Sequence, residues 1–450
     1  MKKIALILMA LIVIFVIYYI KIGSKQLTGE TRKEVNRELV QLKQSGFLID
    51  EQNLSKDKQK IILTFQDMNK ITNYFNKQGQ HLNRNDINML KGMQIGIDIE
   101  YMPTASDALG MDIYPIKLPT SFYQNINQKD KRVIKELEKM IKEKLFLIHI
   151  NINKLLSNFN GYVKDIDREF KDNETKAHLI SKGFKFNGTI KDEKIEDVKQ
   201  ILERLSYQVD DQLDINISGL KVTIKNSDNR VYNNIEYGIK SFDIINKIEE
   251  PFTLRINNIT GLSQDRLKEN LLNSISKVKV SFMSFTQNGK KTILNTIIMN
   301  TRLNNINKKA LEELENRSSK NMDKNSSMEQ FIPLLKELFK DNISIDIPNI
   351  SVAKITNNGK SFDGFKLKAL VKAEKNFDWK SLDNNPLAVT NLINAKINIE
   401  ASNELVTIIS SDPRAMVMMM IMQPIDKNGK KYYDIEFSKG SLKINGKPFM

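Results

Sequence analysis

Histidine is the residue type here best suited to bind a metal ion or to transfer protons near neutral pH, and it occurs at His81, His149 and His178. No two of these have the spacing that puts two ligands on one helix face, no H-E-x-x-H motif is present, and the chain has no cysteine. The sequence therefore predicts no histidine or thiolate metal site. His149 lies in an apolar, strand-like stretch, so we expect it to be structural or pore-facing rather than catalytic.

Oxygen ligands gather at Asp210, Asp211, Asp214 and Asn216, a set that could serve a calcium ion. The set lacks the spacing of an EF-hand loop and its terminal glutamate, so we interpret it as acidic residues on an exposed strand edge. The chain has no G-x-S-x-G nucleophile motif, and its Asn-Gly-Lys triplets lack the spacing of a phosphate-binding loop. We predict no catalytic residues, no cofactor and no metal, and hence a protein that is not an enzyme.

Residues 4–20 form an unbroken apolar run, with Lys2 and Lys3 before it and Lys21 after it. At about 1.5 Å per helical residue, such a run is near the lower limit for crossing a bilayer. A cleaved signal peptide is the alternative, but Gly23 and Ser24 are the only hint of a cleavage site. We favour a retained anchor over residues 1–22. Its expected membrane residues are Ile4, Leu6, Leu8, Leu11, Ile14, Phe15, Ile17, Tyr18 and Tyr19.

Lysines on both sides of the run leave its orientation open by charge alone. A pair of lysines before an apolar core is the usual form of an export signal, so we place the bulk of the chain outside the cytoplasm.

Lys and Arg total 69 against 54 Asp and Glu, a formal net charge of +15. Nucleic acid, anionic lipid or lipopolysaccharide could pair with such an excess. The charges are scattered and no RNA or DNA motif accompanies them, so we predict no nucleic-acid partner.

Apolar periodicity predicts a mixture of helices and antiparallel strands. Asn-Gly pairs at 288, 358, 428 and 445, each followed by Lys and flanked by strand-like residues, predict hairpin turns. Residues 317–327 form the most linker-like polar stretch. Helices are expected at 31–46, 67–76, 131–145, 195–205, 308–316 and 328–339. Strands are expected at 93–101, 111–118, 146–152, 213–224, 252–259, 278–285, 292–301 and 343–355.

An internal repeat aligns residues 213–222 with residues 343–352 without a gap. Ile215 and Ile345 are among the matched apolar positions, and a predicted helix precedes each copy. The repeated unit is helix, strand, turn, strand, and chance matching of alternating strands is the alternative. Such repeats lengthen a sheet by stacking.

A methionine-rich run at 415–422 is the remaining unusual feature. Methionine side chains are flexible and suit surfaces that accept variable apolar partners. The run therefore predicts either a lipid- or peptide-binding surface or an ordinary buried element. The possible lipid-facing residues are Met416, Met418, Met419, Met420 and Met422.

The chain resembles the YdgA family, bacterial proteins of unknown function anchored in the inner membrane. The resemblance rests on the short anchor followed by Gly29 and a polar helix, on the helix-then-strand unit that includes residues 343–352 with Gly359 in its turn, and on the closing stretch 432–448. That stretch contains G-x-L-x-I-N-G-K, from Gly440 to Lys447. The resemblance implies a β-rich body in the periplasm and a single pass through the inner membrane. It transfers no catalytic residues.

We therefore expect an α+β protein: one transmembrane helix, then an elongated, twisted, mostly antiparallel sheet with helices packed along one face. An incompletely covered face would leave an apolar groove suited to acyl chains, so the expected function is to bind or conduct membrane lipid. The alternative is an envelope scaffold with a closed core and protein partners; an envelope hydrolase is the least favoured interpretation. The expected parts are an anchor at 1–22, a stalk helix at 23–50, an α+β part at 51–160, a central β-rich part at 161–306 and a C-terminal β-rich part at 307–450.

Overall fold

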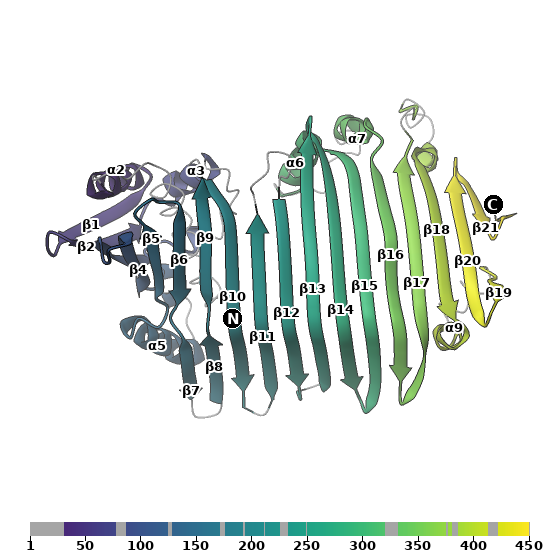
Figure 1. Ribbon diagram of the computed structural model, residues 1–450, viewed down its shortest axis with the longest axis horizontal. Coiled ribbons are helices and arrows are strands. Elements are labelled where there is room, and N and C mark those ends of the chain that lie inside the picture. Colours follow the sequence, from purple (N-terminus) through teal and green to yellow (C-terminus); the bar gives the residue numbers. More distant parts are fainter. Residues whose placement is uncertain are drawn as a thin grey trace. The chain divides into compact units, whose positions relative to one another are not determined.

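The computed structural model shows a chain of mostly antiparallel strands with a few helices, consistent with the predicted α+β class (Figure 1). The chain divides into two compact units, here called unit 1 (Met1–Thr223) and unit 2 (Ile224–Met450). Strand β11 (Leu213–Lys225) crosses that division. The structure describes residues 31–77, 87–124, 128–171, 176–191, 194–210, 212–225, 233–248, 250–319, 332–374, 377–379, 386–412 and 422–449.

The sheet of unit 1 runs in the order β1-β2-β3-β4-β5-β6-β9-β10, every pair being antiparallel. Strand β10 also pairs with β8 through its second half, and β8 pairs with β7. The strands are β1 (Phe47–Asn53), β2 (Lys58–Phe65), β3 (Gln94–Tyr101), β4 (Asp107–Lys117), β5 (Ile148–Asn153), β6 (Asn158–Val163), β7 (Ile166–Lys171), β8 (Lys176–Lys182), β9 (Lys185–Lys191) and β10 (Lys194–Val209). The helices are α2 (Thr31–Gln44), α3 (Met68–Lys77), η1 (Thr120–Tyr123) and α5 (Gln128–Lys142).

Helices close one face of this sheet and give unit 1 a conventional core. The helix predicted at 31–46 is confirmed as α2, and its apolar stripe of Val35, Leu39 and Leu42 is buried. On α3, Ile71 and Phe75 are likewise buried. These helix residues join the inner residues of β2 to β6 in one cluster of buried apolar side chains. Burial of this kind is the main stabilising contribution to a domain.

Two Asn-Gly pairs that were not predicted as turns lie inside this sheet. Gly161 of β6 faces Phe186 of β9, and Gly188 of β9 faces Phe159 of β6. A Cβ on Gly161 would come within 2.4 Å of the Phe186 ring, and a Cβ on Gly188 within 2.3 Å of the Phe159 ring. Each glycine therefore makes room for the aromatic ring on the opposite strand.

The helix predicted at 195–205 is wrong: these residues belong to β10. The register shifts between Ile195 and Asp197, which places Ile195 and Val198 three residues apart and so contributes to the helix-like spacing. Pairing with β9 and β8, which lie close in sequence, decides the structure over local pattern.

The sheet of unit 2 runs antiparallel in the order β12-β13-β14-β15-β16-β17-β18-β20-β21-β22, and β19 also pairs with β20. The strands are β12 (Asn233–Asn246), β13 (Phe252–Lys268), β14 (Leu271–Gln287), β15 (Lys290–Asn307), β16 (Ser344–Asn357), β17 (Lys360–Ala373), β18 (Ile393–Ser402), β19 (Ile425–Lys427), β20 (Lys430–Ser438), β21 (Ser441–Ile444) and β22 (Lys447–Pro448). The helices are α6 (Lys308–Ser319), α7 (Ile332–Phe339), η3 (Pro386–Leu392) and α9 (Asn403–Ser410).

The four predicted Asn-Gly turns of unit 2 are confirmed. Both residues have positive φ in every case, for example 50° at Asn288 and 72° at Gly289. Two successive residues with left-handed backbone match the twist of a tight hairpin. Asn, Asp and Gly are the residues that adopt this backbone conformation readily. The other three pairs begin at Asn358, Asn428 and Asn445.

Both segments of the predicted internal repeat form strands, whereas the helix predicted before the first segment is wrong. Residues 213–222 lie in β11 and residues 344–352 in β16, and helix α7 precedes β16 as predicted. The first copy is instead preceded by strand β10, so the unit of helix, strand, turn and strand does not occur twice. Ile345 has 43% of its surface exposed, so this matched position does not lie in a closed core.

A line of skipped pairs crosses six neighbouring strands of unit 2. Between β12 and β13, Ile239 pairs with Ile259 and Ser241 pairs with Asn257, but Lys240 and Asn258 between them do not pair. The same gap continues across the next four strand pairs. Left-handed residues inside a strand break its alternation, and two positions on the line have φ values of 52° and 53°. The line consists of Lys240, Asn258, Ser281, Thr296, Ala353 and Gly364.

Candidate functional site: an apolar sheet face

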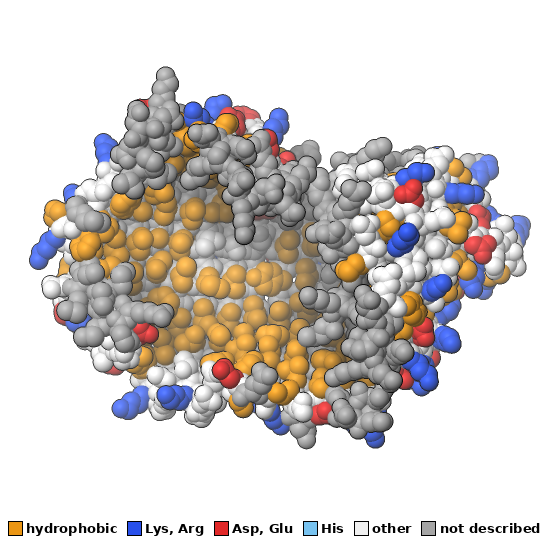
Figure 2. Space-filling view, turned by 180° about the vertical axis from the view of Figure 1, so that it is seen from behind, with side chains coloured by type: hydrophobic (Ala, Val, Ile, Leu, Met, Phe, Trp, Pro, Cys, Tyr) orange, Lys and Arg blue, Asp and Glu red, His pale blue; other side chains and the backbone are white. Residues whose placement is uncertain are grey.

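One face of the unit 2 sheet carries rows of apolar side chains, here called the apolar face. Residues directly opposite one another in neighbouring strands share a face, so the register identifies each row. Apolar side chains gather in one broad field over the strands of unit 2 in Figure 2. The longest row crosses eight strands and consists of Tyr237, Gly261, Val278, Met299, Ile350, Leu367, Ile399 and Tyr433.

Two further rows flank the line of skipped pairs. Because alternation breaks at that line, residues three apart in a strand point to the same face. The cluster of Val352, Ile355 and Phe362 demonstrates this, with Phe365 and Leu294 packed against it. One row is Ile239, Ile259, Val280, Ile297, Val352 and Phe365; the other is Phe242, Ile256, Met283, Leu294, Ile355 and Phe362.

The apolar face remains partly open to solvent. Met299 has 40% of its surface exposed. Phe285 lies two residues beyond Met283 in β14, hence on the same face, and has 37% of its surface exposed. Most other residues in the rows are half-buried. Unit 1 differs sharply, because its apolar cluster includes 34 buried residues among those described, against three in the cluster of unit 2. A large exposed apolar surface on a folded protein marks a site of interaction.

The opposite face of the same strands is polar. Lys279 of β14 lies opposite Thr260 of β13, and Lys366 of β17 lies opposite Glu400 of β18. Lys396 of β18 pairs with Glu436 of β20 at 2.7 Å. The sheet is therefore two-sided, as expected for an antiparallel sheet with one solvated face.

The apolar face is long enough for lipid acyl chains. Its longest row spans seven inter-strand spacings of about 4.8 Å, which gives about 34 Å across the strands. One leaflet of a bilayer contributes about 15 Å of a hydrocarbon core about 30 Å thick.

Helix α9 covers part of the face, where Leu405 packs against the cluster of Val352, Ile355 and Phe362. The N-cap Ser402 fixes this helix by accepting a hydrogen bond from the Leu405 amide.

A polar network lies on the sheet of unit 1 around His149. Its Nδ1 is 2.7 Å from Asp112 Oδ1, and its ring stacks on Tyr162 with 5.0 Å between centroids. The hydrogen bond to Asp112 raises the pKa of His149, although partial burial opposes the shift. Nearby, Lys144 Nζ lies 2.9 Å from Asp98 Oδ2 and 3.7 Å from the centre of the Tyr114 ring. These groups satisfy one another across strands, as expected of a structural network.

The network predicts a pH-dependent contribution to stability. A histidine whose pKa is higher in the folded state stabilises the fold fully below its unfolded pKa of about 6.5, and this stabilisation is lost as pH rises through the folded value. His149→Gln should therefore weaken protection of the β4 and β5 amides in hydrogen exchange by about 0.5 kcal/mol more at about pH 5.5 than at about pH 8.5. The same loss at both pH values would contradict this role.

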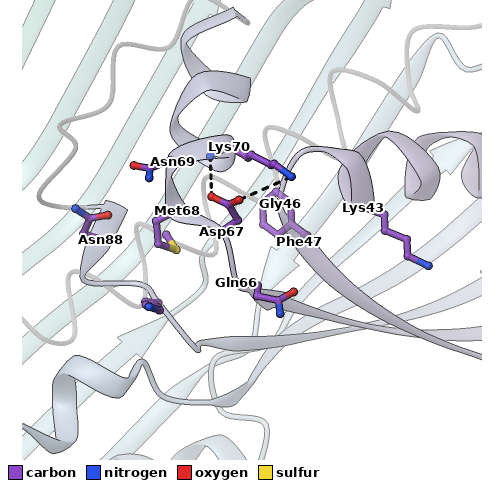
Figure 3. A pocket seen from close by; sticks show the side chains of 10 residues that line it. Lys43, Gly46, Phe47, Gln66, Asp67, Met68, Asn69, Lys70 and Asn88 are labelled. Atoms are coloured by element: carbon purple, nitrogen blue, oxygen red, sulfur yellow. Dashed lines mark hydrogen bonds and ion pairs between the residues drawn. The ribbon is translucent and has the colours of Figure 1, made fainter.

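A shallow pocket opens in unit 1 where α2 ends and α3 begins (Figure 3). Asp67 accepts a hydrogen bond from the Lys70 amide at 3.1 Å and lies 3.9 Å from Lys70 Nζ. The carboxylate thus caps α3 and is already paired. The remaining lining is mostly polar and includes Lys43 and Lys91, with no grouping suited to catalysis among these described residues.

The other predicted site residues have separate structural roles or lie outside the described residues. Asp210 accepts a hydrogen bond from the Lys176 amide, and His178 pairs with Asp167 at 2.7 Å. Within the described ranges, no three His, Asp or Glu side chains are grouped to hold a metal ion. Met422 is described and is half-buried. Some of the predicted site residues lie outside the described ranges: the whole anchor, His81, Asp211, Met416, Met418, Met419 and Met420.

The rows of the apolar face were not predicted as site residues, although the sequence carries a signal for them. Apolar residues three apart interrupt the alternation of six strands, as in Leu294 with Ile297 and Phe362 with Phe365. At the same height in each of these six strands, the apolar positions thus shift from one alternating set to the other. A line of kinks across the sheet produces such a shift.

Among the helices of the described ranges, none has the length and apolarity that spanning a bilayer requires. No protein-family model matches the chain, and no curated protein matches it significantly.

Proposed function

We propose that this protein is a non-enzymatic envelope protein, held in the bacterial inner membrane by residues 1–22, whose body binds or conducts membrane lipid along the apolar face of unit 2. The observation that carries the proposal is the eight-strand apolar row, which stays partly exposed in a folded sheet on every strand except β20, where Tyr433 is buried. Acyl chains match this surface in chemistry and in length. The resemblance to the YdgA family agrees with this location and adds no activity.

The second candidate is an envelope scaffold that captures partner peptides along a strand edge. The far edge of β20 is occupied by β19 and β21, which are three and four residues long. Short edge strands are a common protection against pairing with other chains. Within the described part of unit 2, this strand edge is therefore poorly suited to capture a peptide. The apolar face makes lipid binding the better supported of the two functions.

The proposal is tested by the lipid content of the full-length protein. The chain is extracted from membranes, washed extensively in a detergent without acyl chains and analysed by mass spectrometry. Retention of about one or more diacyl lipids per chain is the expected result. Protein that retains its fold but no lipid would favour the scaffold.

The anchor makes a separate prediction. Because residues 4–20 are long enough to span a bilayer and lack a good cleavage site, the protein should stay with membranes after a carbonate wash and keep its amino terminus. A periplasm-dependent reporter fused at the carboxyl terminus should be active. A soluble form beginning near Gly23 or Ser24, or a silent reporter, would contradict the anchor or its orientation.

A further inference from the structure

A patch of polar side chains interrupts the apolar face on β13, β14 and β15. Ser263, Ser276 and Thr301 lie directly opposite one another, and Asp265 lies opposite Ser274 in the next row. These positions are two and four residues beyond the longest apolar row, so alternation places them on the same face. All five are half-buried. We call them the polar patch.

The hydrogen-bonding groups of the polar patch are not used within the protein. Among the described residues, these five side chains have no hydrogen-bond or ion-pair partner. Serine and threonine hydroxyls can both donate and accept, and a carboxylate accepts at both oxygens. A ligand that removes water from this patch must supply matching groups, because an unpaired buried polar group costs about 1–3 kcal/mol.

An aromatic side chain borders the patch. Tyr237 of β12 lies over Gly261 of β13, so closely that a Cβ on Gly261 would fall 2.1 Å from the ring. Gly261 is two residues before Ser263 in the same strand. The Tyr237 hydroxyl lies 2.4 Å from the place that this Cβ would occupy. It therefore adds one more polar group at the boundary between the apolar rows and the polar patch.

The charge of the patch selects against phosphate. Asp265 is its only charged member. Of the described side chains at same-face positions that flank it on β12 to β15, Ile235, Leu267, Leu272 and Leu303 are apolar, and none is lysine or arginine. Among these described side chains, a phosphate would face a carboxylate without a compensating cation, which is unfavourable in a partly desolvated site. Neighbouring hydroxyls of a sugar or glycerol would donate to Asp265 and exchange hydrogen bonds with the serines and Thr301.

We propose that the polar patch binds an uncharged, hydroxyl-rich head group, so that the lipid handled by the apolar face is a glycolipid or a related neutral glycerolipid. This inference rests on the proposed lipid function and adds the class of head group. The acyl chains lie along the apolar rows, and the patch fixes the position of the head group at one end of them. A few well-placed polar groups in an apolar site commonly set ligand orientation in this way.

The test compares two ligands with the same chain and different head groups. Octyl glucoside and octyl phosphate, each below its micelle-forming concentration, are titrated calorimetrically into the full-length protein held in an amphipathic polymer. The wild type should bind octyl glucoside about tenfold more tightly. The double variant Ser276→Ala, Thr301→Val should lose this preference and keep its affinity for octyl phosphate. Thr260→Val, on the polar face, should leave both affinities unchanged.

Each outcome decides between the two proposals. If the wild type binds both ligands equally, or if the double variant keeps the preference for glucoside, the head-group assignment is wrong and the lipid function stands. If the wild type binds neither ligand, both proposals fail. A double variant that does not fold is replaced by Asp265→Asn, which should reduce the preference without changing side-chain volume.

Discussion

Replacing Gly364 with alanine is expected to destabilise unit 2 by about 3 kcal/mol. Gly364 lies on the line of skipped pairs, where a Cβ would fall 2.0 Å from the Val352 carbonyl oxygen and 2.8 Å from its carbon. Backbone atoms cannot move aside as the end of a flexible side chain can. The variant must therefore give up the kink or separate β16 from β17.

Gly238→Ala is the matched control, because Gly238 also lies in a strand of unit 2 and a Cβ there meets only the Ile259 carbonyl oxygen at an ordinary 3.7 Å. Its stability should change by less than about 1 kcal/mol. Trp379 is the only tryptophan and packs against Phe377 and Phe339 within unit 2, so its fluorescence reports urea unfolding of this unit. Equal midpoints for the two variants would contradict the kink.

Replacing Phe285 and Met299 together with glutamine is expected to reduce bound lipid about tenfold while leaving the Trp379 unfolding transition almost unchanged. About two-fifths of each side chain is exposed. Covering that fraction with an acyl chain contributes roughly 0.8 kcal/mol for each residue, and two such losses correspond to about tenfold in affinity. Stability changes little because these exposed surfaces have few protein contacts to lose.

Ile298→Gln is the control for this pair, since Ile298 neighbours Met299 in β15 but points to the polar face. It should leave bound lipid unchanged. Lipid is measured per folded molecule, so that loss of protein is not mistaken for loss of binding. A large fall in the unfolding midpoint of the double variant, with lipid per folded molecule retained, would place these side chains in an ordinary core.

The parts of this fold that the sequence predicts are those decided by short-range rules. The stripe of Val35, Leu39 and Leu42 predicts α2, because helix periodicity and burial coincide there. The Asn-Gly pairs predict hairpins because left-handed backbone is accessible to both residues.

The parts that escape prediction are decided between strands. Residues 195–205 have helical spacing, yet pairing with β8 and β9 makes them a strand. Thr296 has a positive φ that a β-branched residue seldom adopts, and it lies on the line of skipped pairs between Ser281 and Ala353 of the neighbouring strands. Whether an apolar strand face is covered also depends on where distant helices pack, so the open face of unit 2 could be suggested but not located from alternation alone.

The most direct test of lipid binding by the apolar face is photocrosslinking in intact cells. A benzophenone amino acid is placed at Met299, on the apolar face, or at Ile298, on the polar face of the same strand. After irradiation, the purified protein is examined by mass spectrometry for lipid adducts. We predict a diacyl-lipid adduct at position 299 and little or none at position 298. No lipid adduct at position 299, or equal adducts at both positions, would contradict lipid binding by this face.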